Sequence, residues 1–242
     1  MPHGNWDYGS YTPKKTIAGL ADMGELAVRL GSPDTFDRRG DVMLVDDFED
    51  NINKWVIGAS GVGGGVALSN DYARNGSRCA KITSGDAIGD TTSITRNMPY
   101  PVISRIGFEI SFTYHAHFNL WGWYVNLYDG VNSHTANIKY ADATQLLTYY
   151  NSAGADITFA TAVDLYAGTA LFHTAKLVVD FTTDKYVRFI LDDKEYDLSS
   201  YAIKVGASAN QPLLSAVYAV ATGTNENNIC YADDAIITQN EP

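Results

Sequence analysis

Residues 107–128 read GFEISFTYHAHFNLWGWYVNLY, a segment with two runs of alternating apolar and polar side chains. The first run places on one face Phe108, Ile110, Phe112 and Tyr114, and on the other Glu109, Ser111 and Thr113. The second places on one face Trp121, Trp123, Val125 and Leu127, and on the other Tyr124, Asn126 and Tyr128. A period of two is typical of a β-strand with one face in the core and the other toward water or a ligand. The segment therefore predicts two strands of an antiparallel sheet that packs on a core.

The same pattern extends in both directions, and turn signals such as Asn75-Gly76 and Asp129-Gly130 separate about fourteen predicted strands. These strands are 42–48, 54–57, 65–69, 77–83, 91–97, 102–114, 121–128, 134–140, 144–150, 171–181, 185–191, 194–198, 214–222 and 229–237. So many strands without a long helical period predict an all-β fold, a two-sheet antiparallel jelly-roll β-sandwich. We expect in its core Phe48, Trp55, Phe108, Phe112, Trp123, Leu177, Val179, Phe189 and Ile236. In strand 185–191 we expect Tyr186 and Arg188 to face outward.

Residues 1–40 differ from the rest of the chain. Trp6, Tyr8 and Tyr11 lie in a polar stretch with no period, which is typical of an extended arm. A short helix over about 22–30 is predicted by the apolar spacing of Met23, Leu26 and Leu30. A helix this short is not stable alone in water, so we expect it to dock on its own domain or on a neighbouring subunit. The predicted organisation is an arm, 1–40, followed by the sandwich, 41–242.

The charge balance restricts the partners of the protein. The 242 residues include 28 Asp and Glu against 17 Lys and Arg, a formal net charge of −11. We therefore expect neither nucleic acid nor an anionic membrane surface as a partner, because both would be repelled. No run of 18 apolar residues and no signal-peptide pattern is present. Cys79 and Cys230 are either two buried thiols or one disulfide.

Two motifs carry a family resemblance. The sequence VDDFED at 45–50 is followed by Trp55, and CYADDAII stands at 230–237. They resemble the first and last strands of jelly-roll carbohydrate-binding modules and of concanavalin-A-like lectin domains. Residues 172–189 are similar to a late hairpin of the lectin-like domains, so the resemblance covers roughly 45–238. It implies the sandwich fold and specifies a ligand poorly, because one fold hosts many functions.

The resemblance also implies a structural calcium ion beside the paired first and last strands. Its ligands would be Glu49 and Asp234, with Asp47 or Asp233, since Ca²⁺ prefers carboxylate and carbonyl oxygens. The alternative is that these acids cap turns and keep a sheet edge soluble.

Catalytic signatures are missing from the sequence. A glycosidase of this fold needs two carboxylates close together, yet the strand around Glu109 supplies one. His115 and His117 share a strand face but lack a visible third metal ligand. We therefore predict that the protein is not an enzyme.

Two kinds of function remain. Aromatic and polar side chains that we expect on the same side of one sheet favour a glycan-binding surface, although ordinary cross-strand ladders have the same composition. These residues are Glu109, Tyr124, Asn126, Tyr128, Lys139 and Arg188.

The aromatic arm favours assembly instead, with a second copy or a capsid protein as partner. Residues 23–42 resemble the N-terminal stretch of phage-encoded sandwich proteins. We predict a structural accessory protein of a bacteriophage virion that decorates or cements the capsid. The alternative is an extracellular carbohydrate-binding module that recognises an oligosaccharide on one sheet face.

Overall fold

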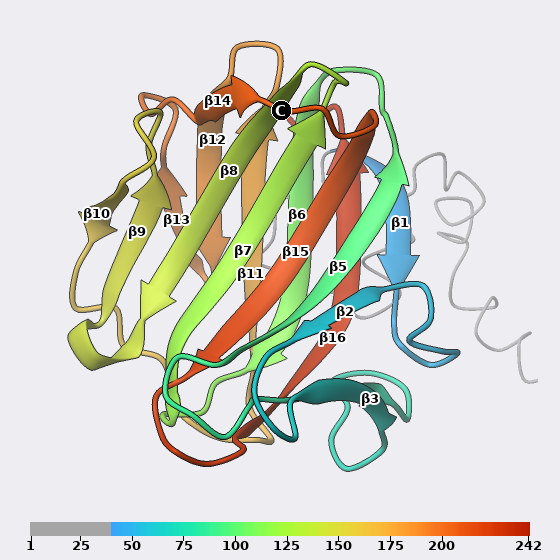
Figure 1. The fold of residues 1–242 in the computed structure, drawn as a ribbon, viewed down its shortest axis with the longest axis vertical. Coiled ribbons are helices and arrows are strands. Elements are labelled where there is room, and N and C mark those ends of the chain that lie inside the picture. The colour runs from blue at the N-terminus through green and yellow to red at the C-terminus, as the bar shows by residue number, and fades with distance from the viewer. Residues whose placement is uncertain (1–39) are drawn as a thin grey trace, which may run out of the picture.

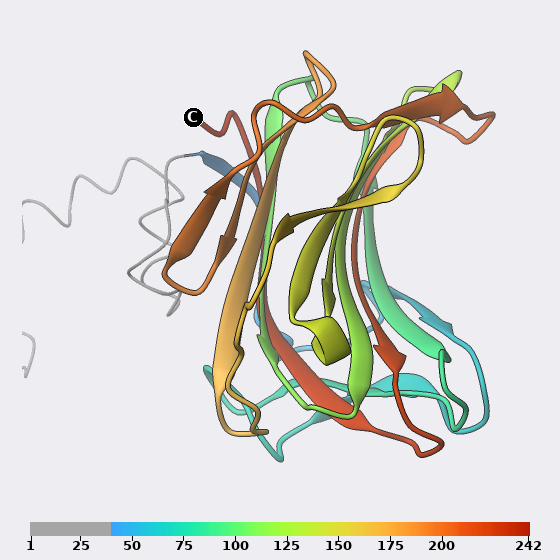
Figure 2. The same cartoon turned by 90° about the vertical axis from the view of Figure 1, so that its left-hand side faces the viewer.

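A computed structural model describes residues 40–242 as two antiparallel sheets of eight strands each, packed face to face (Figures 1 and 2). Sheet A contains, in spatial order, β13 (Lys194–Asp197), β12 (Lys185–Leu191), β11 (Phe172–Asp180), β6 (Arg105–Thr113), β16 (Ile229–Gln239), β4 (Cys79–Thr83) and β3 (Gly65–Ser69), with β1 (Asp41–Asp46) also on β16. Sheet B contains β10 (Asp156–Ala160), β9 (Leu146–Tyr150), β8 (Asn132–Ala141), β7 (Phe118–Tyr128), β15 (Leu213–Thr222), β5 (Thr91–Pro99) and β2 (Val56–Ala59), with β14 (Lys204–Ala207) also on β8. A 3₁₀ turn, η1 (Asp142–Thr144), joins β8 to β9. The predicted fold class is confirmed.

The core lies between the inner faces of the two sheets, as the alternation predicts. Phe112 of β6 meets Trp123 of β7 with ring centroids 5.3 Å apart, and Phe189 of β12 meets the same indole at 5.3 Å. All three side chains are fully buried. Aromatic contacts of this kind between the sheets hold the sandwich together.

Two bulges change the predicted facing of side chains in sheet A. In β16 the pairing with β6 skips between Asp233 and Ile236, and Asp234 adopts a φ of 47°. Ile237 therefore enters the core, and Ile236 pairs with Glu109 on the outer face, so the core prediction for Ile236 is wrong. An extra residue in a bulge reverses the alternation that follows it.

The second bulge lies in β12, where the pairing with β11 skips one residue between Arg188 and Tyr186. Tyr186 consequently points into the core and is fully buried, which corrects the outward facing predicted for it. Arg188 faces outward as predicted.

The opening motif has a clear local structure. Asp46 accepts hydrogen bonds from the Phe48 backbone N–H (3.1 Å) and from the Trp55 indole N–H (2.9 Å). This carboxylate fixes the turn after β1, so that Phe48 and Trp55 stack at 5.5 Å in the core.

The structure also bears on the two cysteines, on membrane-spanning helices and on the predicted arm. Cys79 and Cys230 are buried free thiols. Within the part of the chain that the structure describes, no helix is long and apolar enough to cross a membrane. The predicted arm falls outside this part, and with it Trp6, Tyr8, Tyr11, Met23, Leu26 and Leu30.

The two sheets differ in what lies on their outer faces. Figure 1 looks onto the outer face of sheet B, and in Figure 2 the ends of this sheet bend away from sheet A. The outer face of sheet B is therefore concave, which suits it to hold an extended ligand.

Candidate functional site

The concave face of sheet B carries a row of partly exposed side chains from β7. Tyr124, Asn126 and Tyr128 lie there, as the alternation predicts, while Trp123 and Val125 point into the core. The register with β8 adds further polar groups, because Asn137, Thr135 and Ser133 lie opposite these three residues. The result is a polar, aromatic surface with few charges.

The Tyr124 ring lies over Gly122, which has no side chain. A Cβ atom at Gly122 would come within 2.5 Å of the Tyr124 ring and 2.8 Å of its hydroxyl. The ring thus occupies the space that a side chain at position 122 would fill. Burial raises the pKa of Tyr124, and the nearby Lys139 ammonium and Asn137 amide lower it less strongly. The phenol stays protonated and can donate or accept a hydrogen bond.

A buried tyrosine from the other sheet shapes this surface from beneath. β8 pairs with β9 through Ile138–Ala141 and with β14 through Asn132–Thr135. At the junction, the Tyr186 hydroxyl accepts a hydrogen bond from the Asn137 backbone N–H at 2.9 Å. Its proton faces the carbonyls of Tyr150 (2.8 Å) and Asn137 (3.2 Å). The inserted hydroxyl replaces ladder hydrogen bonds, and it fixes Asn137 and Tyr150 where three strands meet.

Two lysines flank the ring of Tyr150. Lys139 Nζ lies 5.8 Å from the ring centroid and forms an ion pair with Asp156 at 2.8 Å. Lys204 Nζ lies 5.3 Å from the same centroid and donates a hydrogen bond to the Tyr150 hydroxyl at 3.3 Å. Both contacts fall within the range of cation–π attraction, so the ring and the two ammonium groups hold one another in place.

One acceptor in this cluster has no partner. Asn137 is only 5% exposed, and among the described residues no donor reaches its Oδ1. An unsatisfied buried oxygen is costly, so such a group is commonly satisfied by water or a ligand. We define the candidate site as the Tyr124 cluster, which consists of Gly122, Tyr124, Asn137, Lys139, Tyr150, Asp156 and Lys204.

Two residues predicted for this surface lie elsewhere. Glu109 and Arg188 lie on the outer face of sheet A, where they are only 3% and 7% exposed. Arg188 donates to a carboxylate oxygen of Glu241 at 2.9 Å and to the main-chain oxygen of Pro242 at 2.8 Å. The prediction of one shared face is wrong, because alternation assigns a side of a strand but not the sheet to which the strand belongs.

The acidic side chains of the motifs at 45–50 and 230–237 accept hydrogen bonds from other residues of the protein. Glu49 accepts hydrogen bonds from Ser77 and from the Arg78 backbone, which lowers its pKa. Asp234 accepts from Arg74 at 2.5 Å and from the Asn75 amide at 2.7 Å. These contacts favour the turn-capping alternative.

The other two predicted calcium ligands are also engaged with the chain. Asp233 accepts from the backbone N–H groups of Arg74 and Asn75, and Asp47 accepts from that of Glu49. Between residues 40 and 242, no group of three or more His, Cys, Asp or Glu side chains is placed to hold a metal ion. The predicted calcium ion stays a prediction.

His115 and His117 lie side by side beyond β6, with ring centroids 4.8 Å apart. Burial lowers the pKa of His115, and the neighbouring His117 adds to this effect. The pair lines a shallow hollow with Gly168 and Thr169, away from the Tyr124 cluster.

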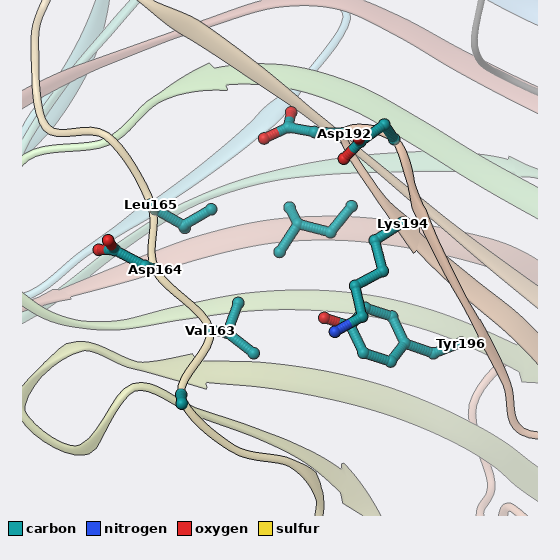
Figure 3. A pocket seen from close by; sticks show the side chains of 9 residues that line it. Val163, Asp164, Leu165, Asp192, Lys194 and Tyr196 are labelled. Carbon is teal, nitrogen blue, oxygen red and sulfur yellow. The ribbon is translucent and has the colours of Figure 1, made fainter.

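A second hollow, of about 160 Å³, opens at the side of the sandwich. Figure 3 shows Val163, Asp164 and Leu165 on one wall, opposite Asp192, Lys194 and Tyr196. The Asp192 carboxylate is already occupied, because it contacts His173 at 2.6 Å and accepts from the Thr174 backbone at 2.9 Å. The Tyr124 cluster is the better candidate, since it lies on the concave face and combines aromatic rings with polar and charged groups.

Sequence reasoning found Tyr124 and Lys139 of the cluster, and Asn126 and Tyr128 on the same face, but missed five members of the cluster: Gly122, Asn137, Tyr150, Asp156 and Lys204. Asp156 and Lys204 lie on β10 and β14, two short strands without a predicted counterpart. Asn137 and Tyr150 lie on predicted strands, and their outward alternation was an available signal. What was missing was the register that brings them beside Tyr124.

Comparisons with known proteins identify the fold. The sequence matches no protein-family model and no curated protein. Similar solved structures include a protein of unknown function from Shewanella oneidensis MR-1, with a TM-score of 0.54 at 12% identity over 89% of this chain and 93% of that one. Alginate lyase vAL-1 from Chlorella virus has a TM-score of 0.52 at 12% identity, over 82% and 100% of the two chains. The carbohydrate recognition domain of Emp46p has a TM-score of 0.50 at 12% identity, over 80% and 92%. At such identities the likeness concerns the fold alone, and the chain has the jelly-roll β-sandwich fold of lectin and carbohydrate-recognition domains.

Proposed function

We propose that this protein binds carbohydrate on the concave outer face of sheet B. The observation that carries the proposal is the Tyr124 ring, which lies over Gly122 with its hydroxyl beside Asn137 and Lys139. Sugars bind to flat aromatic faces and to planar polar groups that hydrogen-bond their hydroxyls. The Asn137 amide beside the Tyr124 hydroxyl adds a planar polar group to the same surface.

The distance between Tyr124 and Tyr128 favours an oligosaccharide as the ligand. Tyr124 and Tyr128 are four residues apart on β7, about 13 Å at the usual rise of a strand. This distance spans two or more sugar units. An open concave face buries little of its ligand, so we expect weak binding at a single site and a gain from multivalent presentation.

Carbohydrate binding does not require catalysis. The described strands of sheet B contribute one carboxylate to this face, that of Asp156. It forms an ion pair with Lys139. A glycosidase needs a second carboxylate nearby. That the protein is not an enzyme stays a prediction, as does its assembly on a virion, because the predicted arm lies outside the described residues.

A glycan array probed with the full chain tests the proposal. We expect binding to at least one class of oligosaccharide, and loss of that binding in the double variant Tyr124→Ala, Tyr128→Ala. Tyr166→Ala is the matched control, because Tyr166 is 79% exposed on the loop between β10 and β11. An array without signal, or binding that survives the double substitution, would contradict the proposal.

A further inference from the structure

We infer that the Tyr124 cluster selects an acidic sugar, whose carboxylate or sulfate group binds to Lys204. This inference rests on the proposed function and specifies its ligand class. It starts from a cluster on the concave face that combines two lysines with two tyrosine rings.

The two lysines of the cluster differ in how their charges are compensated. Lys139 is neutralised by Asp156 at 2.8 Å. For Lys204, by contrast, the described residues include no carboxylate within ion-pair distance, and its hydrogen bond goes to the neutral Tyr150 hydroxyl. The cluster therefore carries a net positive charge on a protein whose formal charge is −11. A local cation on an otherwise anionic surface attracts an acidic ligand to that point.

Lys204 is also held in place by its surroundings. Its Nζ lies between the Tyr150 ring and the β9–β10 turn, where a Cβ atom at Gly154 would be 3.0 Å from Lys204 Nζ and 3.1 Å from the Tyr150 hydroxyl. Gly154 has a φ of 84°, a conformation that favours glycine. The close approach of this turn restricts the lysine side chain, so less entropy is lost when an anion binds.

The cluster also offers two donors to an acidic group. The Lys204 ammonium and the Tyr150 hydroxyl can both donate to such a group, and charge-assisted hydrogen bonds are the stronger kind. The backbone of Tyr150 is tied to that of Asn137 through the Tyr186 hydroxyl. A uronic acid fits this set, with its carboxylate on Lys204 and its ring on Tyr124. A sulfated sugar presents the same charge to Lys204.

Calorimetric titration of the full chain with three probes tests the inference. Oligogalacturonate carries carboxylates, carrageenan oligosaccharide carries sulfates, and carboxyl-reduced oligogalacturonate is the neutral match of the first. We expect an acidic probe to bind roughly tenfold or more tightly than the neutral one, the size of one charge-assisted hydrogen bond. The preference should decrease as salt is added.

The variant Lys204→Met keeps the apolar stem of the side chain and removes its charge. We expect it to lose the acidic preference, so that it binds the acidic and the neutral probe with equal affinity. Lys185→Met is the matched control, because Lys185 is an exposed lysine of sheet A. Preference for one acidic probe over the other distinguishes a carboxylate from a sulfate ligand.

Two failures are distinguishable. Equal affinity of the unmodified protein for acidic and neutral probes, or an acidic preference that survives Lys204→Met, overturns the inference and leaves carbohydrate binding intact. Absence of binding to all three probes, together with an array without signal, overturns both.

Discussion

At the scale of single residues, the position of Tyr124 depends on what Gly122 lacks. The ring occupies the space of the missing side chain, and the hydroxyl reaches Asn137 and Lys139 for that reason. A larger residue at position 122 would exclude the ring from this space and change its position on the sheet. Gly122 is thus part of the candidate site although it offers no functional group.

The variant Gly122→Ala tests this relation. The added methyl group would meet the far end of a flexible side chain, so we expect the Tyr124 ring to move and the fold to persist. Sugar affinity should fall about as far as in Tyr124→Ala, several-fold to about tenfold, with a small change in the free energy of unfolding. Gly206→Ala is the control on the same face, because nothing lies within 4 Å of its Cβ position. Unchanged sugar affinity in Gly122→Ala would show that the ring position is not needed.

Asp233 is a second residue whose environment matters, because it changes the pKa of the side chain and with it the stability of the fold. Its burial and the neighbouring Asp234 raise the pKa of Asp233 to about 7, although backbone N–H groups of Asn75, Arg74 and Asp234 act in the opposite direction. In an unfolded chain the value is about 3.9. The folded state therefore binds the proton more tightly, and the stability gained from it is fully present below about pH 4.

We predict that this contribution is lost as the pH rises toward 7. The free energy of unfolding should decrease over this interval by an amount on the order of a few kcal/mol, and Asp233→Asn should remove that decrease. Urea titrations at several pH values measure it, with exposed Asp193→Asn as the control. An equal pH dependence in the protein and in Asp233→Asn would show that Asp233 is ionised throughout.

At the scale of elements, His173 joins two segments that no strand pairing connects. Its ring nitrogens contact the Asp192 carboxylate at 2.6 Å, in the β12–β13 turn, and the Tyr166 carbonyl at 2.9 Å, in the loop before β11. Both partners are acceptors, so the doubly protonated ring satisfies both. Burial lowers the pKa of His173, but the hydrogen bonds to Asp192 and Tyr166 and the charge of Asp192 outweigh it and raise the pKa overall.

The raised pKa predicts how this connection responds to pH. Stabilisation by the imidazolium is complete below the unfolded value of about 6.5 and is lost as the pH rises through the folded pKa. We expect faster amide hydrogen exchange in the loop 161–171 at pH 8 than at pH 6, after correction for the intrinsic pH dependence of exchange. His173→Gln should show fast exchange at both values. A loop equally protected at both pH values would mean that the second hydrogen bond contributes nothing.

At the scale of the whole molecule, the aromatic contacts between the sheets carry the stability of the sandwich. Phe112 contacts Trp123, Tyr218 and His173, from both sheets, and is fully buried. Phe112→Ala should lower the free energy of unfolding by about 3–5 kcal/mol. Denaturant titration measures this, with exposed Tyr166→Ala as the control; a loss below about 1 kcal/mol would contradict the central role of this ring.

The predicted assembly through residues 1–40 also belongs to this scale. In the full chain, the triple variant Trp6→Ala, Tyr8→Ala, Tyr11→Ala should reduce the oligomer to a smaller species, because aromatic anchors dominate the energy of interfaces. Light scattering measures the mass, and a β-sheet circular dichroism spectrum confirms that the variant is folded. An unchanged mass would contradict the predicted role of the arm.

The fold class, the presence of two sheets and the outward facing of Tyr124, Asn126 and Tyr128 could be predicted from the amino-acid sequence. Alternation with a period of two is a local property, so it needs no knowledge of which strands pair. It failed at Ile236 and Tyr186, because a bulge inserts one residue and reverses the faces beyond it. Nothing in the local pattern marks these bulges.

Which of the outward-facing residues lie next to one another could not be predicted, because it depends on how the strands pair. Glu109 and Tyr124 belong to consecutive predicted strands, yet β6 lies in sheet A and β7 in sheet B. Conversely, Tyr124 and Lys204 are eighty residues apart in sequence (204 − 124 = 80) and reach one cluster through the pairing of β7 with β8 and of β8 with β14. The candidate site is therefore a product of register between distant strands, which arises from packing of the whole sandwich and not from any one segment.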